Sequence, residues 1–227
     1  MCGRFTITVT MDELKEYLSE YYDIDEMKSS IVVPRYNVAP GQEVISIIND
    51  GSKNRVGLLK WGFVPSFAKD NKLAHTMINA RSEMIHEKKA YRPSLEHKRC
   101  VILANGFYEW KNTGEEKIPM RILMKNHSLF PIAGLWSSYV KRDGTKEHTC
   151  TIITTQANDI VSQIHNRMPV ILNEEDRKTW LNPNIKDYNL VTPLLKPFLP
   201  ERMYAYQVST KVNSALNEIP ECIEPIV

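Results

Sequence analysis

The sequence predicts an α+β protein whose core is a mainly antiparallel, β-barrel-like sheet flanked by helices. Apolar segments of strand length come in runs instead of alternating with helices, and this order favours an antiparallel sheet. The 13 Pro and 9 Gly residues are spread evenly along the 227 residues, without a Gly/Ser linker or an internal repeat. We therefore expect a single domain over residues 1–227. It is long enough to bury a core without disulfide or metal staples.

The first two predicted elements lie at the N-terminus. Residues 5–9 alternate between apolar and polar side chains, as in a half-buried strand. Residues 10–22 have the pattern of a helix, and Thr10 and Glu13 have the spacing of a capping box. Apolar side chains recur on one face of this helix: Met11, Leu14, Leu18 and Tyr21.

The remaining strands and helices follow from apolar periodicity. Segments 44–48 and 56–64 have the pattern of two strands joined by a turn at Asn49-Asp50-Gly51. Further strands are predicted over 100–103, 120–124, 129–133, 149–155 and 204–208. Helices are predicted over 159–164, 174–181 and 187–195.

Four stretches break this pattern with polar and special residues. They are residues 34–41, 79–83, 106–110 and 164–169. Each lies beside an apolar segment that can hold it rigidly. Positions where local patterning breaks are more often functional than average, so these stretches are candidates for a site.

Composition excludes several classes of protein. Lys and Arg total 29 and Asp and Glu total 27, so the formal net charge is only +2. This balance argues against a protein that coats nucleic acid by bulk charge, although a local basic site remains compatible with it. No apolar run approaches the roughly 18–20 residues that span a bilayer, and the N-terminus lacks the apolar region of a secretory signal. We therefore expect a cytoplasmic protein that does not bind membranes. Nothing in the sequence suggests a dimer seam, so we expect a monomer.

The four cysteines are Cys2, Cys100, Cys150 and Cys222. No pair has the spacing of metal ligands, so we expect no metal site and no cofactor. Cys100 and Cys150 lie inside apolar runs and are predicted to be buried packing residues.

Cys2 differs because it directly follows the initiator methionine. That methionine is usually removed before a small residue, and its removal leaves an amine and a thiol on one residue. Their unperturbed pKa values of about 8 and about 8.5 give both groups an appreciable nucleophilic fraction near neutral pH. The amine of such a 1,2-aminothiol condenses with an aldehyde to an imine, and the thiolate closes on the imine carbon to a thiazolidine. Alternatively, the thiolate attacks an acyl carbon with the amine as base.

A second interpretation is that Cys2 belongs to a frayed terminus with no role. The following residues favour the functional interpretation. Gly3 permits close approach of the backbone, Arg4 can contact an anion, and the predicted strand over 5–9 would attach the terminus to the body.

Six motifs in this order resemble the SRAP (SOS-response-associated peptidase) family of abasic-site processing proteins. The resemblance covers essentially the whole chain. The motifs are Met1-Cys2-Gly3-Arg4-Phe5, Pro34-Arg35-Tyr36-Asn37-Val38-Ala39-Pro40, Trp61-Gly62-Phe63-Val64-Pro65, Asn79-Ala80-Arg81-Ser82-Glu83, Gly106-Phe107-Tyr108-Glu109-Trp110 and His165-Asn166-Arg167-Met168-Pro169. Each motif alone is weak, whereas all six together are highly specific.

The resemblance implies a fold and a function. It implies a single α+β domain around a β-barrel-like core, which agrees with the pattern of strands. It also implies binding to abasic sites in single-stranded DNA and a covalent thiazolidine link to the ring-opened deoxyribose, which shields the lesion. The peptidase in the family name refers to removal of the initiator methionine, thought to be autocatalytic. Whether this chain also reverses the crosslink or cleaves the strand as a lyase stays open.

The resemblance also implies roles for individual residues. Cys2 resembles the nucleophile, and Asn79 resembles the residue that positions its amine. Glu109 and His165 resemble the groups that transfer protons. Arg81 and Arg167 resemble ligands of the DNA phosphates beside the lesion. The resemblance further implies that four residues line the DNA path: Arg4, Asn37, Pro40 and Trp61.

The chemistry supports these assignments independently of the family. Ring opening and imine formation both need proton transfer, and a carboxyl group and an imidazole suit that task when burial tunes their pKa. Glu109 lies between Tyr108 and Trp110 and beside the apolar run 101–103, so we expect burial to raise its pKa. The alternatives are a glutamate on the surface of a strand and an ion pair with Lys111.

Each other candidate has an ordinary structural interpretation. His165 could be structural or exposed, and Asn79 could be a turn or cap residue. Arg81 and Arg167 could form surface ion pairs, for instance Arg81 with Glu83. Five aromatic side chains could stack on unpaired bases, but we expect most of them to pack in the core: Trp61, Phe63, Phe67, Tyr108 and Trp110.

Three other classes of function compete with this interpretation. Class II glutamine amidotransferases also begin Met-Cys-Gly, but this chain is short for their usual second domain and its later motifs do not fit. A protease that acts on other proteins would pair Cys2 with His165, yet the chain lacks a Gly-x-Ser-x-Gly elbow and a His-Glu-x-x-His site. A non-catalytic nucleic-acid binder would show salt-sensitive binding that is indifferent to the lesion.

Overall fold

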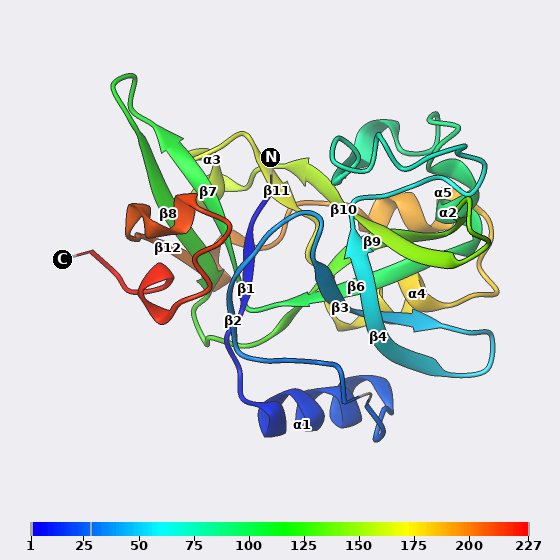
Figure 1. The fold of residues 1–227 in the computed structure, drawn as a ribbon. Helices are drawn as coiled ribbons and strands as arrows, with labels where there is room; N and C mark the ends of the chain where they lie inside the picture. The colour runs from blue at the N-terminus through cyan, green and yellow to red at the C-terminus, as the bar shows by residue number, and fades with distance from the viewer. Residues whose placement is uncertain (1, 28, 227) are drawn as a thin grey trace.

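The structure, a computed structural model, describes residues 2–27 and 29–226 and contains two β-sheets with helices around them (Figure 1). The mixture of helices with mainly antiparallel strands confirms the predicted α+β class. No helix within these described residues is long and apolar enough to cross a bilayer.

The larger sheet closes on itself as a five-stranded barrel. Its strands pair in the order β10–β4–β3–β6–β9 and back to β10. They are β3 (Glu43–Asn49), β4 (Asn54–Trp61), β6 (Arg99–Ala104), β9 (Phe130–Val140) and β10 (Lys146–Gln156). All neighbours in this ring are antiparallel except β4 and β10, which pair in parallel at Lys60 and Trp61. Two short strands extend it along β10, namely β5 (Asn79–Arg81) and β11 (Arg167–Pro169).

The smaller sheet is antiparallel and carries the N-terminal strand. Its order is β12–β8–β7–β1–β2. The strands are β1 (Phe5–Ile7), β2 (Arg35–Val38), β7 (Gly106–Asn112), β8 (Lys117–Met124) and β12 (Met203–Gln207). The β7–β8 hairpin projects away from the barrel, and β1 crosses between the hairpin and β2 (Figure 1).

Helices are short and lie outside the sheets. The α-helices are α1 (Met11–Tyr22), α2 (Arg92–His97), α3 (Asp159–Ser162), α4 (Glu174–Leu181) and α5 (Tyr188–Val191). The 3-10 helices are η1 (Ser82–Met84), η2 (Thr192–Leu194), η3 (Pro200–Arg202), η4 (Thr210–Asn213) and η5 (Pro220–Cys222).

The capping box predicted for the first helix is confirmed. The Thr10 hydroxyl accepts a hydrogen bond from the Glu13 N–H, and Glu13 Oε2 accepts one from the Thr10 N–H at 2.7 Å. The predicted apolar face is wrong at one position, because Tyr22 is buried whereas Tyr21 is 37% exposed. The buried face continues through Leu14 and Leu18 to Tyr22, which follows the helical four-residue step.

The predicted strands and later helices occur with changed ends. Segment 56–64 ends as a strand at Trp61, because Gly62 turns the chain with a φ of +139°. Segment 129–133 is the start of the longer β9. The helix over 174–181 coincides with α4, whereas 159–164 is shortened to α3. Segment 187–195 divides into α5 and η2, which has a proline in its first turn and so lacks a donor there.

The four unusual stretches were not predicted as strands, yet each overlaps one: β2, β5, β7 and β11. The half-buried alternation predicted for residues 5–9 is also wrong within β1, where Phe5, Thr6 and Ile7 are all buried. Phe5 packs in one buried cluster and Ile7 in another, while the Thr6 hydroxyl hydrogen-bonds to Asn105 Oδ1 at 3.0 Å. Both faces of β1 are therefore covered.

Buried apolar side chains form two main clusters. One contains Cys100, Ile102 and Cys150 and joins the barrel to the N-terminal segment, and it confirms that these two cysteines are buried packing residues. The other lies between the barrel and helices α1 and α4 and includes Leu18 and Trp180.

Candidate active site

Cys2 lies three residues before Phe5, the first residue of β1, which is the strand between β2 and β7. Phe5 of β1 pairs with Val38 on one side and with Phe107 on the other, so the backbone of this segment is fixed from both sides. The Cys2 side chain is buried in the same cluster as Phe5 and Trp61. The interpretation of Cys2 as part of a frayed end is therefore wrong. Removal of Met1 concerns a residue outside the described ones.

Asn79 connects the N-terminal segment to the barrel. It is the first residue of β5 and pairs in register with Ile152 of β10. Its Nδ2 donates a hydrogen bond to the Cys2 carbonyl oxygen at 2.8 Å. Its Oδ1 is buried and has no hydrogen-bond partner among the described residues, so one acceptor remains available beside the Cys2 backbone.

Glu109 lies on β7 and is only 3% exposed. Burial raises the pKa of this carboxyl, and the nearby charge of His165 opposes the rise. The predicted direction of the shift is confirmed, and the alternative of a glutamate on the surface of a strand is wrong. Glu109 Oε1 lies 3.9 Å from His165 Nδ1, which is near the upper limit of an ion pair.

The Cys2 thiol differs from the free cysteine assumed from the sequence. Burial, and then the negative charge of Glu109, raise the pKa of this thiol well above its ordinary value. Burial therefore disfavours the thiolate in this chain relative to a free cysteine. The sequence could not show it, because the burial comes from segments far along the chain.

His165 is half-buried and follows α3. Its backbone N–H donates to the Val161 carbonyl at 2.8 Å, which fixes the start of the motif. Its Nδ1 accepts the Arg167 backbone N–H at 3.0 Å, so a neutral ring carries its proton on Nε2. The imidazole is thus oriented by its own motif, with Glu109 near the same nitrogen.

Arg81 and Arg167 are brought together because β5 and β11 both pair with β10. Arg81 is opposite Thr154, and Arg167 is opposite Gln156. Both arginines line an open pocket of about 630 Å³, together with His165. Arg81 is exposed, and its side chain makes no hydrogen bond or ion pair to any described residue.

The ion pair suggested between Arg81 and Glu83 is wrong. Glu83 instead binds Arg167 with two hydrogen bonds, from Nη1 at 2.6 Å and from Nη2 at 3.0 Å. Hydrogen bonds from Arg167 also lower the pKa of the Glu83 carboxyl. The chain turns into η1 directly after β5, and this turn brings Glu83 to Arg167.

Arg4 and Asn37 form a clamp on the C-terminal segment. Arg4 Nη1 donates to Asn37 Oδ1 and to the Val212 carbonyl, both at 2.6 Å. Asn37 is fully buried, and its Nδ2 donates to the carbonyls of Ser214 at 2.9 Å and Asn217 at 2.8 Å. Contact with DNA remains a prediction for both residues, and the burial of Asn37 does not favour it.

Trp61 is also buried, and its Nε1 donates to the Ile78 carbonyl at 2.8 Å, directly before Asn79. This bond makes Trp61 a support for β5. Pro40 is half-buried in the turn after β2. Their predicted places along the DNA path stay predictions.

The remaining aromatic candidates divide as expected. Phe63 and Tyr108 are buried in the core, and the Tyr108 hydroxyl donates to the Tyr36 carbonyl at 2.8 Å. Trp110 is half-buried beneath the Arg4 guanidinium, and Phe67 is exposed.

Two residues near the site carry no motif signal. The Thr154 carbonyl accepts a hydrogen bond from Arg167 Nη2 at 2.6 Å. The Tyr91 hydroxyl makes a long hydrogen bond of 3.4 Å to the Asn79 carbonyl. Both contacts depend on strand pairing and loop packing over long sequence separations, so a local pattern could not reveal them.

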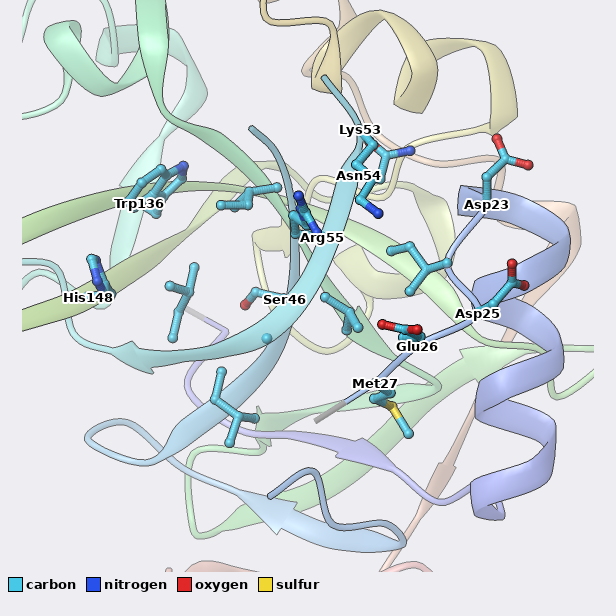
Figure 2. A pocket seen from close by; sticks show the side chains of 16 residues that line it. Asp23, Asp25, Glu26, Met27, Ser46, Lys53, Asn54, Arg55, Trp136 and His148 are labelled. Carbon is cyan, nitrogen blue, oxygen red and sulfur yellow. The ribbon is translucent and has the colours of Figure 1, made fainter. Parts of the chain in front are cut away.

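A larger pocket, of about 760 Å³, lies elsewhere, between the segment after α1 and the β3–β4 hairpin. Trp136 and His148 lie on one side of it, and Asp25 and Glu26 lie on the other, with Arg55 between them (Figure 2). None of the candidate site residues lines this pocket.

Comparison with known proteins supports a family assignment. The family model described as SOS response associated peptidase (SRAP) matches residues 1–215. Abasic site processing protein YoqW of Bacillus subtilis (strain 168) is 47% identical over 226 residues, which cover 99% of this chain and 99% of that protein. Abasic site processing protein YedK of Escherichia coli (strain K12) is 27% identical over 227 residues, covering 100% of both chains.

The fold comparison agrees. A crystal structure of a protein from Bacteroides thetaiotaomicron superposes with a TM-score of 0.88 at 27% identity and covers 100% of both chains. Since the family model spans nearly the whole chain and a relative at 47% identity matches it along its length, this chain belongs to the SOS response associated peptidase (SRAP) family, as its six sequence motifs predicted.

Proposed function

We propose that this chain binds abasic sites in single-stranded DNA and forms a covalent thiazolidine crosslink through Cys2, which shields the lesion. The relatives YoqW and YedK carry the name abasic site processing protein, which supports this class of substrate. The observation that carries the proposal is the convergence of three polar groups from distant segments on the buried N-terminal cysteine. Asn79 donates a hydrogen bond to the Cys2 carbonyl, the negative charge of Glu109 acts on the Cys2 thiol, and His165 lies 3.9 Å from Glu109.

The reaction balances without an oxidant or a reductant. The α-amine nitrogen of Cys2 attacks C1′ of the ring-opened deoxyribose aldehyde and forms a carbinolamine. Loss of one water gives an imine. Cys2 Sγ then adds to the imine carbon, the ring nitrogen gains the thiol proton, and a five-membered thiazolidine closes. Protein and DNA are joined with the release of one water.

The raised pKa of Glu109 suits a proton donor. A buried carboxyl keeps its proton to higher pH than an exposed one, so it can protonate the departing hydroxyl of the carbinolamine. Glu109 can also open the closed sugar, by taking the proton of the C1′ hydroxyl and giving a proton to the ring oxygen of the sugar. His165, 3.9 Å from Glu109, is the second group that exchanges protons at this place.

The chemistry sets the order of the two attacks. The imine carbon that Cys2 Sγ attacks exists only after the amine has condensed with the aldehyde, so the amine reacts first and the sulfur closes the ring afterwards. The free acceptor Asn79 Oδ1 is the group that holds the amine in position.

Removal of Met1 precedes this chemistry in the proposal. Hydrolysis of the Met1–Cys2 peptide bond consumes one water and frees the α-amine. Glu109 and His165 serve as the proton-transfer groups for this step as well. The family description, which names a peptidase, supports a hydrolytic step of this kind.

Arg81 and Arg167 hold the DNA phosphates beside the lesion. Arg81 is exposed at the pocket that His165 also lines, so a bound phosphate lies close to the proton-transfer groups. Arg4, Asn37, Pro40 and Trp61 shape the walls of the path.

Intact mass spectrometry tests the proposal directly. The protein is mixed with a single-stranded oligonucleotide that carries one abasic site, and the same strand with an intact base is the control. We expect protein that has lost Met1, and an adduct whose mass equals protein plus DNA minus one water. Absence of an adduct, or an adduct that retains Met1, would contradict the proposal.

A glutamine assay separates the competing acyl-transfer function. We expect no ammonia release from glutamine beyond the buffer control. Release that disappears in Cys2→Ala would favour an amidotransferase over the proposed crosslinking function.

A further inference from the structure

Glu83 occupies the face of Arg167 that binds anions most strongly. A guanidinium binds a carboxylate or a phosphate best through two parallel N–H groups. In this chain Nη1 and Nη2 of Arg167 are directed at the two carboxylate oxygens of Glu83, at 2.6 Å and 3.0 Å.

The other N–H groups of Arg167 leave little for a second anion. Nη2 also donates to the Thr154 carbonyl at 2.6 Å. Nε is buried, and the whole side chain is only 12% exposed. One N–H of Nη1 remains, so a phosphate can gain a two-point contact with Arg167 only after Glu83 has left.

Glu83 is able to leave, because its side chain is 43% exposed whereas Arg167 is held from below by Thr154. Arg81, two residues before Glu83, is exposed without a partner among the described residues. A strand that approaches Arg81 therefore meets a second arginine that already carries a carboxylate.

We propose that Glu83 is a specificity-determining residue that occupies the phosphate-binding face of Arg167 until a DNA phosphate displaces it. This inference rests on the proposed function, in which Arg167 contacts DNA. Glu83 lowers the affinity of the protein for every single strand, damaged or intact. Intact strands then dissociate, while an abasic strand is retained by the covalent bond.

Binding to undamaged single-stranded DNA tests the inference without involving the crosslink. The probe is a fluorescent oligothymidine, titrated at several salt concentrations with the wild type and with Glu83→Gln. We expect Glu83→Gln to bind about 3–10-fold more tightly, since Gln offers Arg167 a single neutral oxygen and no negative charge. We also expect a steeper salt dependence, by up to about 0.7 in the log–log slope for one added phosphate contact.

Two control measurements separate the effect of the Glu83–Arg167 contact from the effect of removing any negative charge. Glu87→Gln removes one negative charge from the same segment, but Glu87 lies 3.8 Å from His86 rather than against Arg167. We expect a smaller gain from Glu87→Gln. In an Arg167→Ala background, Glu83→Gln should lose its advantage over Glu87→Gln.

Equal effects of Glu83→Gln and Glu87→Gln overturn the inference, as does a gain that persists without Arg167 or a weaker binding of Glu83→Gln. If the wild type still crosslinks abasic DNA in any of these cases, the proposed function stands. If no variant binds single-stranded DNA, both fail.

Discussion

Two pockets lie near opposite ends of the same strand, β10. The pocket of Figure 2 is lined by His148 near the start of the strand, whereas β5 and β11 pair with its end, from Ile152 to Gln156. The first pocket has the larger volume, about 760 Å³, compared with about 630 Å³ for the second. The second is lined by three of the candidate residues, Arg81, His165 and Arg167.

The two places differ most in how their charged groups are buried and paired, and less in the volume of the pocket. In the larger pocket, Arg55 is paired with Asp50 at 2.6 Å across a short turn, and Asp23, Asp25 and Glu26 are exposed. At the other end, a buried carboxyl with a raised pKa lies beside an imidazole and a cysteine from three distant segments. Burial of interacting titratable groups costs stability, and on this criterion we favour the second place as the candidate site although its pocket is smaller.

Of the substitutions considered, loss of Cys2 should reduce crosslinking the most. Cys2→Ala removes the sulfur that closes the thiazolidine, so the denaturation-resistant adduct should fall by more than about 100-fold. Any imine formed by the amine alone hydrolyses more readily. Denaturing gels with an abasic single strand measure the yield. Cys222→Ser, which keeps a polar atom near the Asn217 carbonyl, is the matched control and should crosslink normally. A comparable adduct from Cys2→Ala would rule out the thiazolidine.

Glu109→Gln has the next largest effect. Removal of the proton donor should slow crosslinking by about 10²–10⁴-fold at saturating DNA, with binding changed less than about threefold. Single-turnover kinetics and a binding titration measure the two quantities. Glu116→Gln, at the exposed end of the same hairpin, should leave both unchanged. Equal losses of rate and affinity would assign Glu109 to DNA binding instead.

The pH dependence of stability tests the burial of Glu109. Because its folded pKa is raised, the neutral form is favoured in the fold. Its contribution to stability is present below the unfolded pKa and is lost as pH rises through the folded value. The wild type should therefore lose stability relative to Glu109→Gln on going from pH 4 to pH 8, with a shift of about 2–4 °C in Tm per kcal/mol. A constant difference across this range would show that the carboxyl titrates as an exposed one.

Arg81→Ala should act on binding and not on chemistry. Loss of one phosphate contact should weaken single-stranded DNA binding by about 3–10-fold and reduce the salt slope by about 0.7. The crosslinking rate at saturating DNA should stay within about twofold. Fluorescence titrations at several salt concentrations, combined with single-turnover kinetics, separate the two. If Arg81→Ala and Glu109→Gln behave alike, the proposed division of roles between them is wrong.

Elements governed by local periodicity could be predicted from the sequence, and α4 agrees with its predicted bounds. The short motif strands could not. β5 has only three residues and no apolar alternation, and it is a strand because Ala80 is buried and β10 provides its partner. Such pairing is a long-range property that no window of sequence contains.

The grouping of the candidate residues and the raised pKa of Glu109 could be predicted from the sequence, whereas the raised pKa of the Cys2 thiol could not. Motif order brought Cys2, Asn79 and Glu109 into one hypothesis, and their contacts are consistent with it. The Arg81–Glu83 pair that the sequence offered as an alternative does not form, because the partner of Glu83 is Arg167, 84 residues away, and no local pattern shows that pairing. The raised pKa of the Cys2 thiol depends on the same long-range burial.

Arg55→Ala should have the smallest effect on DNA binding and crosslinking, and it tests the comparison between the two pockets most sharply. It removes the same charge as Arg81→Ala, but from the larger pocket, where Arg55 is half-exposed and paired with Asp50. An exposed ion pair contributes about 0–1 kcal/mol, so thermal unfolding should show a small loss of stability. Binding and crosslinking should stay within about twofold, because the net charge alone does not hold the DNA. If Arg55→Ala weakens binding as much as Arg81→Ala, diffuse charge and not the placement of arginines beside Cys2 governs the affinity.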